Sequence, residues 1–108
     1  MNIKTSDQNK FGLTERDMQT IKHIFSKYGE IKKVNLFGSR AKGSFKMGSD
    51  VDLAIMNLGV SEKTIAKLKS DFEESSLPYM IDCIDFSTLT NNDFIDHINR
   101  VGILFYEK

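Results

Sequence analysis

Hydrophobic residues recur along the chain in stretches that alternate between helical and strand-like spacing. Residues 1–12 are polar and show little periodicity, so we predict a flexible N-terminal arm there and one folded domain over residues 13–108. Apolar residues then follow helical spacing over residues 18–28 behind Thr14, which is well suited to cap a helix. Gly29 is expected to end this helix in a left-handed conformation.

Three short stretches rich in β-branched and aromatic residues have the pattern of β-strands. They cover residues 31–37, 51–56 and 79–86. Glycines interrupt the basic and polar segment 38–49 between the first two strands, so this segment is predicted to be a loop with room for one helical turn.

Two further helices are predicted after the second strand. Ser61 is suited to cap the first of them, and Asn91 or Asn92 is suited to cap the second, which Gly102 ends. The apolar tail at residues 103–106 suits either the core or a docking surface. The order of elements predicts an α/β (α+β) fold in which helices pack on a small mixed β-sheet, with a strand order that the pattern does not define.

Composition limits the classes of protein that the chain can represent. Its 108 residues are 40% hydrophobic and 28% charged, which suits one globular domain. Fifteen basic residues balance fifteen acidic ones, so a nucleic-acid partner is not expected. Cys83 is the only cysteine and excludes an internal disulfide, and no apolar run approaches the ~20 residues that span a bilayer. We therefore expect a cytoplasmic protein without a membrane partner.

The segment from Gly38 to Asp52 carries the chemistry. Gly38 allows close approach of the backbone to a ligand, and Ser39 adds a hydroxyl at a possible helix N-terminus, where phosphate is favoured. Asp50 and Asp52 are two residues apart on a predicted strand, so their carboxylates should point the same way and repel each other. A divalent cation such as Mg²⁺ removes that repulsion.

A site with two metal ions needs a third carboxylate, and the third predicted strand offers Asp82 and Asp85. Their odd spacing places them on opposite faces of the strand, so only one can join the other two acids. We select Asp82, because it lies in mid-strand, where a carboxylate is costly unless it is paired or bound to metal. Asp85 is expected to cap the end of the strand.

These motifs resemble a known signature. Gly-Ser at 38–39, ten intervening residues, Asp-x-Asp at 50–52 and another Asp on a later strand resemble the polymerase-beta-like nucleotidyltransferase superfamily. The resemblance covers most of residues 14–106. With its short length, the chain is similar to the minimal nucleotidyltransferases of bacteria and archaea, which are often encoded beside a HEPN-domain protein and act with it as a toxin and antitoxin pair.

The resemblance implies an adenylyltransferase that uses ATP and two Mg²⁺ ions. Asp50 and Asp52 would bind both metals, and Asp82 would hold the catalytic metal and serve the acceptor hydroxyl. The acceptor implied is a tyrosine of the HEPN toxin. Residues implied to bind the nucleotide are Gly38, Ser39, Arg40, Lys42 and Ser49, with Arg40 and Lys42 steadying phosphates.

Two other functions are compatible with the same residues. The first is a module that neutralises its partner by contact alone, although the intact acids count against it. The second is a nucleotidyltransferase that acts on RNA or a small molecule, although the zero net charge disfavours a long RNA. The short chain leaves little room for an acceptor domain, so a second chain is expected to complete the acceptor site in a homo- or hetero-oligomer.

Overall fold

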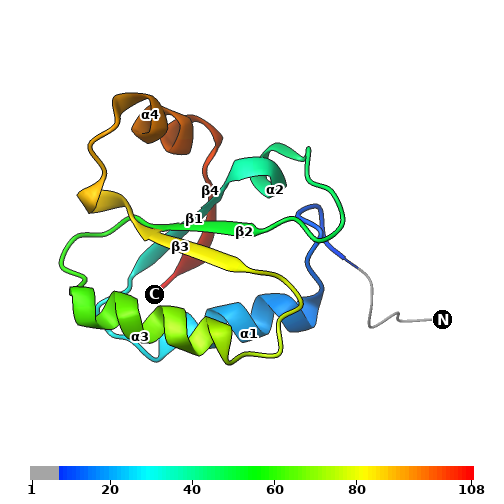
Figure 1. Cartoon of the computed structure of the whole chain (residues 1–108), viewed down its shortest axis with the longest axis horizontal. Coiled ribbons are helices and arrows are strands. Elements are labelled where there is room, and N and C mark those ends of the chain that lie inside the picture. Colours follow the sequence, from blue (N-terminus) through cyan, green and yellow to red (C-terminus); the bar gives the residue numbers. More distant parts are fainter. Residues whose placement is uncertain (1–7) are drawn as a thin grey trace.

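Four strands form one mixed sheet in the computed structural model of the chain, which describes residues 8–108 (Figure 1). The strands lie in the order β3-β2-β1-β4, with β1 antiparallel to both β2 and β4 and β2 parallel to β3. Their bounds are Lys33–Phe37 for β1, Val51–Ile55 for β2, Ile81–Asp85 for β3 and Ile103–Glu107 for β4.

Helices cover both faces of this sheet. Figure 1 shows α1 and α3 together on one face and α2 and α4 on the other. The fold class predicted from the sequence is thereby confirmed. The helices are α1 (Glu15–Ser26), α2 (Gly38–Lys42), α3 (Glu62–Glu73) and α4 (Asn92–Val101), with a 3-10 turn, η1, at Phe86–Thr88. Within residues 8–108, no helix has the length and apolar character needed to cross a membrane.

The helix starts follow the predicted caps. Thr14 Oγ1 accepts a hydrogen bond from the Asp17 backbone N–H, Ser61 caps α3, and Asn91 rather than Asn92 caps α4. The predicted end of the first helix is wrong. The helix stops at Ser26 with Lys27 as a right-handed C-cap, and Gly29 does not adopt a positive φ.

The part of the predicted N-terminal arm that the structure describes is a hydrogen-bonded turn. Asn9 Oδ1 accepts from the backbone N–H groups of Phe11 and Leu13, at 2.9 and 3.1 Å, and the Asn9 N–H donates to the Leu13 carbonyl at 2.8 Å. These bonds satisfy the backbone of residues 9–13 locally, and flexibility of the arm stays a prediction. Residues 1–7 of that prediction lie outside the described residues.

Alternation along β2 divides the core between the two faces of the sheet. Val51, Leu53 and Ile55 are fully buried and join the main cluster beneath α1 and α3. Ala54 points the other way and joins a smaller cluster with Phe37 and Ile98 under α4. The intervening Asp52 therefore lies on the α2 and α4 face, beside a small apolar patch.

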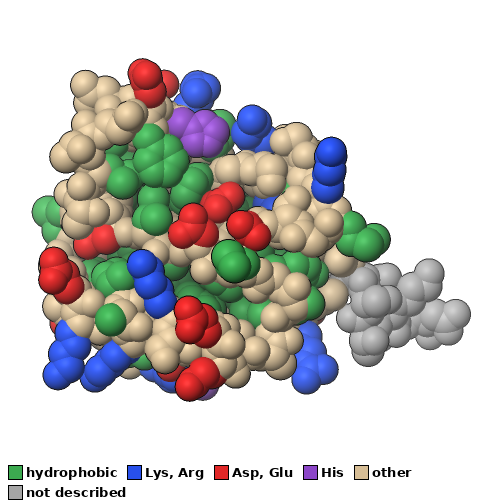
Figure 2. Space-filling view, viewed as in Figure 1, with side chains coloured by type: hydrophobic (Ala, Val, Ile, Leu, Met, Phe, Trp, Pro, Cys, Tyr) green, Lys and Arg blue, Asp and Glu red, His purple; other side chains and the backbone are tan. Residues whose placement is uncertain are grey.

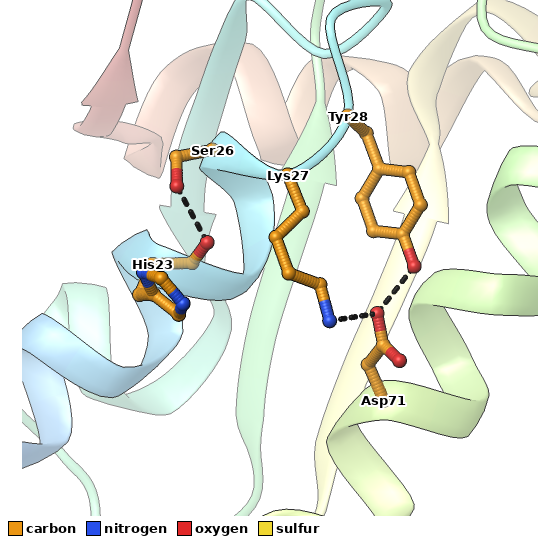
Figure 3. Close-up of polar contacts among 5 residues, drawn as sticks. All are labelled: His23, Ser26, Lys27, Tyr28 and Asp71. Atoms are coloured by element: carbon orange, nitrogen blue, oxygen red, sulfur yellow. Dashed lines mark hydrogen bonds and ion pairs between the residues drawn. The ribbon is translucent and has the colours of Figure 1, made fainter.

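A polar contact joins α1 to α3 on the face remote from α2 and α4 (Figure 3). The Tyr28 hydroxyl donates to the Asp71 carboxylate, and Lys27 Nζ lies 3.0 Å from the same Asp71 oxygen. The hydrogen bond to Asp71 and burial raise the pKa of Tyr28 to about 12. The same bond, with the one from Lys27, lowers the pKa of Asp71. This cluster fastens the two helices to each other.

The apolar tail forms a fourth strand that the sequence pattern did not identify. It pairs with β1 at the edge of the sheet, with an irregularity between Val34 and Asn35. Phe105 is buried in the main core, whereas Leu104 is half exposed. The tail therefore belongs to the fold, and packing in the core accounts for Phe105, whereas a docking role for the exposed Leu104 stays a prediction.

Candidate functional site

Strand register brings two of the predicted acids together. Asp52 of β2 is paired with Asp82 of β3, and on its other side it is paired with Phe37 at the end of β1. Residues that are in register on adjacent strands project from the same face of a sheet. The carboxylates of Asp52 and Asp82 are therefore neighbours, and Asp50 lies one residue before β2 begins.

The competing acid, Asp85, is directed to the opposite face, as the odd spacing predicted. It is in register with Ile55, a residue of the main core beneath α1 and α3. Its Oδ1 accepts from the Ser87 backbone N–H at 3.0 Å and from the Ser87 hydroxyl at 2.7 Å, which caps η1. Asp85 therefore has a structural role at the end of β3.

Gly38 places the backbone directly against the Asp52 carboxylate. Its φ is +75°, a left-handed conformation that favours glycine, and a Cβ built on it would lie 2.3 Å from Asp52 Oδ2. The strand β1 thus turns into α2 in contact with the carboxylate on the central strand. The sequence predicts that Gly38 allows a ligand to approach the backbone. In the structure, the group that lies against Gly38 is the Asp52 carboxylate.

The start of α2 follows at once from this turn. Phe37 is the N-cap and makes no side-chain hydrogen bond to the first turn of the helix, and Ser39 is half-buried in that turn. The N–H groups of this first turn are therefore not capped by a side chain, and they lie next to the residue in contact with Asp52. An anion bound there would lie close to the carboxylates.

Asp52 is in an unusual electrostatic position for a carboxylate. Burial, together with the negative charges of Asp82 and Asp50, raises its pKa from the ordinary value of 3.8 to about 6, while the positive charge of Arg40 opposes the change. The ionised form is thus costly in the absence of a cation. A bound cation would stabilise the ionised carboxylate, and this stabilisation would contribute to the cation's affinity.

The acids of this site could hold a metal ion only together with other ligands. Within residues 8–108, no three His, Cys, Asp or Glu side chains are arranged to hold a metal ion by themselves. Asp50, Asp52 and Asp82 instead supply hard oxygen atoms close enough to affect one another's charge. Mg²⁺ typically takes one or two carboxylates and completes its shell with water and phosphate oxygens, so these residues fit a cation that arrives with a phosphate ligand.

Ser49 and Lys42 are less directly connected to this cluster. The Ser49 hydroxyl accepts a hydrogen bond from the Lys46 backbone N–H at 2.9 Å, so it stabilises its own loop. Lys42 ends α2 on an exposed position and forms no hydrogen bond or ion pair through its side chain with residues 8–108. Contact of either residue with a nucleotide stays a prediction.

Arg40 occupies a different environment from the one expected. Its side chain is 2% exposed, and its guanidinium donates to backbone carbonyls of Phe11, Gly12 and Ser49. The expected contact with phosphate does not fit this geometry, because the guanidinium is buried and its nitrogen atoms are already committed. The sequence pattern could not show this, since the acceptors are main-chain atoms and belong to distant segments.

Acidic side chains gather on one face of the molecule over β2 and β3, with hydrophobic side chains on both sides of them (Figure 2). Cys83 lies on the other face of β3, where it is 2% exposed, and burial raises the pKa of its thiol to about 12. A nucleophilic thiolate is therefore not available there. The chemistry of this face depends on its carboxylates.

The chain is similar in sequence to a family of known proteins. A sequence model of the family described as "Polymerase beta, Nucleotidyltransferase" matches residues 19–108. A "Probable protein adenylyltransferase MntA" of Haemophilus influenzae is 35% identical over 101 residues, which are 89% of this chain and 84% of that protein.

Solved structures share the fold at low sequence identity. One, described as a toxin-antitoxin with AMP-PNP, has a TM-score of 0.67 at 17% identity and covers 85% of this chain and 74% of its own. A mutant of the toxin-antitoxin MntA-HpeT has a TM-score of 0.64 at 14% identity, with 84% and 73% covered. A nucleotidyltransferase described as putative, from Sulfolobus solfataricus, has a TM-score of 0.51 at 17% identity, with 84% and 77% covered.

The contact between Gly38 and Asp52 predicts the outcome of a pair of alanine substitutions. Gly38→Ala and Gly43→Ala both place a Cβ on a left-handed residue, which costs about 1 kcal/mol or more. Only Gly38→Ala also displaces the Asp52 carboxylate, since nothing lies within 4 Å of a Cβ at Gly43. Urea denaturation should therefore show the larger loss for Gly38→Ala, by about 1–2 kcal/mol. Equal losses would contradict the contact.

The raised pKa of Asp52 predicts how stability depends on pH in metal-free protein. The folded state binds this proton more tightly than the unfolded chain, so the ionised carboxylate destabilises the fold above about pH 6. Asp52→Asn should stabilise the protein by about 1 kcal/mol near neutral pH, a figure reduced because solvent screens the half-exposed group. The gain should vanish as the pH falls from 6 toward 3.8. Thermal unfolding in chelator measures it.

Asp85→Asn is the matched control for this measurement. It removes a carboxylate from the same neighbourhood of β3 but from the other face of the sheet, and asparagine can still cap η1. We expect no stabilisation from it. A gain for Asp52→Asn that persists unchanged at acidic pH would show that the carboxylate's charge is not its cause.

Proposed function

Because the chain belongs to the polymerase beta nucleotidyltransferase family, we propose that it transfers AMP from ATP to a hydroxyl of a protein partner. The observation that carries this proposal is the contact of Gly38 with Asp52, flanked by Asp82 in register. It joins the turn that we propose to bind phosphate to a pair of carboxylates on adjacent strands. The partner that we propose is a HEPN-type toxin, with a tyrosine as the acceptor, which makes this chain the antitoxin.

Similar proteins support both halves of the proposal. The relative from Haemophilus influenzae carries the name of a protein adenylyltransferase, and two of the similar crystal structures reported above are of toxin-antitoxin proteins, one of them with AMP-PNP. Gly38 and the acids Asp50, Asp52 and Asp82, which the sequence singled out, lie together on this face. We propose ATP as the nucleotide and Mg²⁺ as the metal, which that similarity and the oxygen donors of the site support.

Each residue of the site would have a defined part in the transfer. Backbone N–H groups at Gly38 and Ser39 would hold the triphosphate, and Asp50, Asp52 and Asp82 would hold two Mg²⁺ ions jointly with its oxygens. When bound, the metal neutralises charge on the phosphates and on the attacking oxygen. Nucleotide contacts of Lys42 and Ser49 belong to the same proposal, whereas Arg40 is left out of it.

The bonds exchanged in this reaction are simple. The acceptor oxygen forms a bond to the α-phosphorus, the bond from the α-phosphorus to the bridging oxygen breaks, and pyrophosphate leaves with that oxygen. Asp82 would take the hydroxyl proton, a role that its exposed position on the edge strand β3 supports. Catalysis would come from positioning and from neutralising charge.

The acceptor that we propose belongs to another molecule. The sheet and its helices use nearly all of residues 8–108. A protein partner fits better than a nucleic acid, because the chain has no net positive charge. A complex with the toxin would complete the acceptor site. Location in the cytoplasm stays a prediction.

The proposal is tested by mixing the purified chain with a HEPN-domain protein encoded beside it, ATP and Mg²⁺. The mass of the partner should rise by one or more adenylyl units, and its toxicity should fall because the phosphate adds bulk and charge at its active site. Asp82→Asn should abolish the increase, and Asp85→Asn should leave it intact. Mass spectrometry measures the product.

The double variant Asp50→Asn, Asp52→Asn separates catalysis from binding. If the partner's mass never changes and its inhibition persists with this variant, the chain acts by contact alone. If Asp85→Asn is inactive and Asp82→Asn is active, the third acid has been assigned to the wrong residue.

A further inference from the structure

A buried arginine joins the segments that carry the site. Arg40 lies in α2, directly after Gly38 and Ser39, and it is the largest side chain that is fully buried. Burial of a guanidinium is costly unless its N–H groups are hydrogen-bonded. Within residues 8–108, ion pairs join Lys27 to Asp71 and Arg100 to Asp96, and none involves this residue. The compensation must come from other groups.

Backbone carbonyls provide that compensation on two sides of the guanidinium. On one side, Arg40 Nε and Nη2 both donate to the Ser49 carbonyl, at 3.2 and 2.8 Å. On the other side, Nη1 donates to the carbonyls of Phe11 and Gly12, at 2.8 and 3.2 Å. Two nitrogen atoms on one oxygen fix the Ser49–Asp50 peptide group with respect to α2.

Two aromatic rings complete the enclosure. The guanidinium carbon lies 5.1 Å from the ring centroid of Phe45 and 4.6 Å from that of Tyr79. Phe45 belongs to the loop between α2 and β2, and Tyr79 lies two residues before β3. Arg40 thus contacts the N-terminal turn, that loop and the approach to β3 while belonging to α2.

The loop between α2 and β2 needs such a restraint. Gly43 and Gly48 both have positive φ, and Met47 is fully exposed. The backbone bond from Ser49 N–H to the Lys46 carbonyl, at 3.0 Å, is local to the loop. A segment held only by local contacts would allow the next residue, Asp50, to change position.

We infer that Arg40 is a positioning residue for the transfer reaction, acting through the Ser49 carbonyl to hold Asp50 and Asp52 in place beside Gly38. It does so without touching the substrate, because its donors are directed at the main chain of the protein. The inference rests on the proposed function for its kinetic part only. Its structural part concerns the affinity of the carboxylates for a divalent cation.

The test compares Arg40→Met, which keeps an apolar chain between the two rings but removes every donor, with Arg40→Lys, which keeps the charge. A matched control, Ile21→Val or Ile21→Ala in α1, is chosen to have the same melting temperature. Arg40→Met should lower kcat about 100-fold, because a small misplacement of reacting groups is costly, and should leave the KM for ATP nearly unchanged. The kcat of Arg40→Lys should lie between that of Arg40→Met and that of the wild type.

A readout without the partner accompanies the kinetics. Titration of each protein with Mn²⁺ in the presence of ATP, followed by electron paramagnetic resonance, should show affinity about tenfold weaker for Arg40→Met than for the Ile21 control. If Arg40→Met does not fold, the same titration of Arg40→Lys tests the inference. A lysine has a single nitrogen atom and cannot donate to one carbonyl from two nitrogen atoms, so its Mn²⁺ affinity should also be weaker than that of the control.

Two results would overturn the inference. One is equal kcat and equal Mn²⁺ affinity for the Arg40 variants and the Ile21 control at matched stability, which would show a purely structural role. The other is a large rise in the KM for ATP with unchanged kcat, which would return Arg40 to direct phosphate contact. Absence of transfer by the wild type would instead refute the proposed function, and the Mn²⁺ titration would still decide the role of Arg40.

Discussion

The carboxylate of Asp52 on the central strand β2 is the constraint around which this molecule is organised. Register pairs Asp52 with Asp82 on one side and with Phe37 on the other, and Gly38 leaves no room for a side chain against it. Neighbouring charge and burial make its ionised form costly. The ionised carboxylate therefore lowers the stability of the fold, and the same electrostatics favour the binding of a cation.

The elements around this carboxylate can be understood as its supports. The apolar face of the sheet packs on α1 and α3, and the Tyr28–Asp71 contact fastens these helices far from the acids. The other face, under α2 and α4, holds a smaller apolar cluster, and Asp50 and Asp82 are exposed there. Acidic side chains gather at the surface over β2 and β3 (Figure 2). The main core thus lies on one face of the sheet and the acids lie on the other. Arg40 links the segments around the acids.

The sequence predicted what depends on local spacing. Helical periodicity and caps located α1, α3 and α4, and the odd spacing of Asp82 and Asp85 correctly placed them on opposite faces. Contacts between residues far apart in the sequence could not be predicted from it. The pairing of the tail with β1 and the order of strands depend on contacts across the chain, and the partners of Arg40 are main-chain oxygens that leave no trace in residue types. Gly29 was misassigned because a right-handed cap already ends α1.

The central claim is that the acids around Asp52 form a site for a divalent cation together with a triphosphate. Calorimetric titration of the isolated protein with ATP, once with Mg²⁺ or Mn²⁺ and once with excess chelator, tests it most directly. Without the cation, Asp50, Asp52 and Asp82 repel the triphosphate, so binding should be weak, and it should become clearly tighter when the cation is present. Equal affinity under the two conditions would contradict the claim.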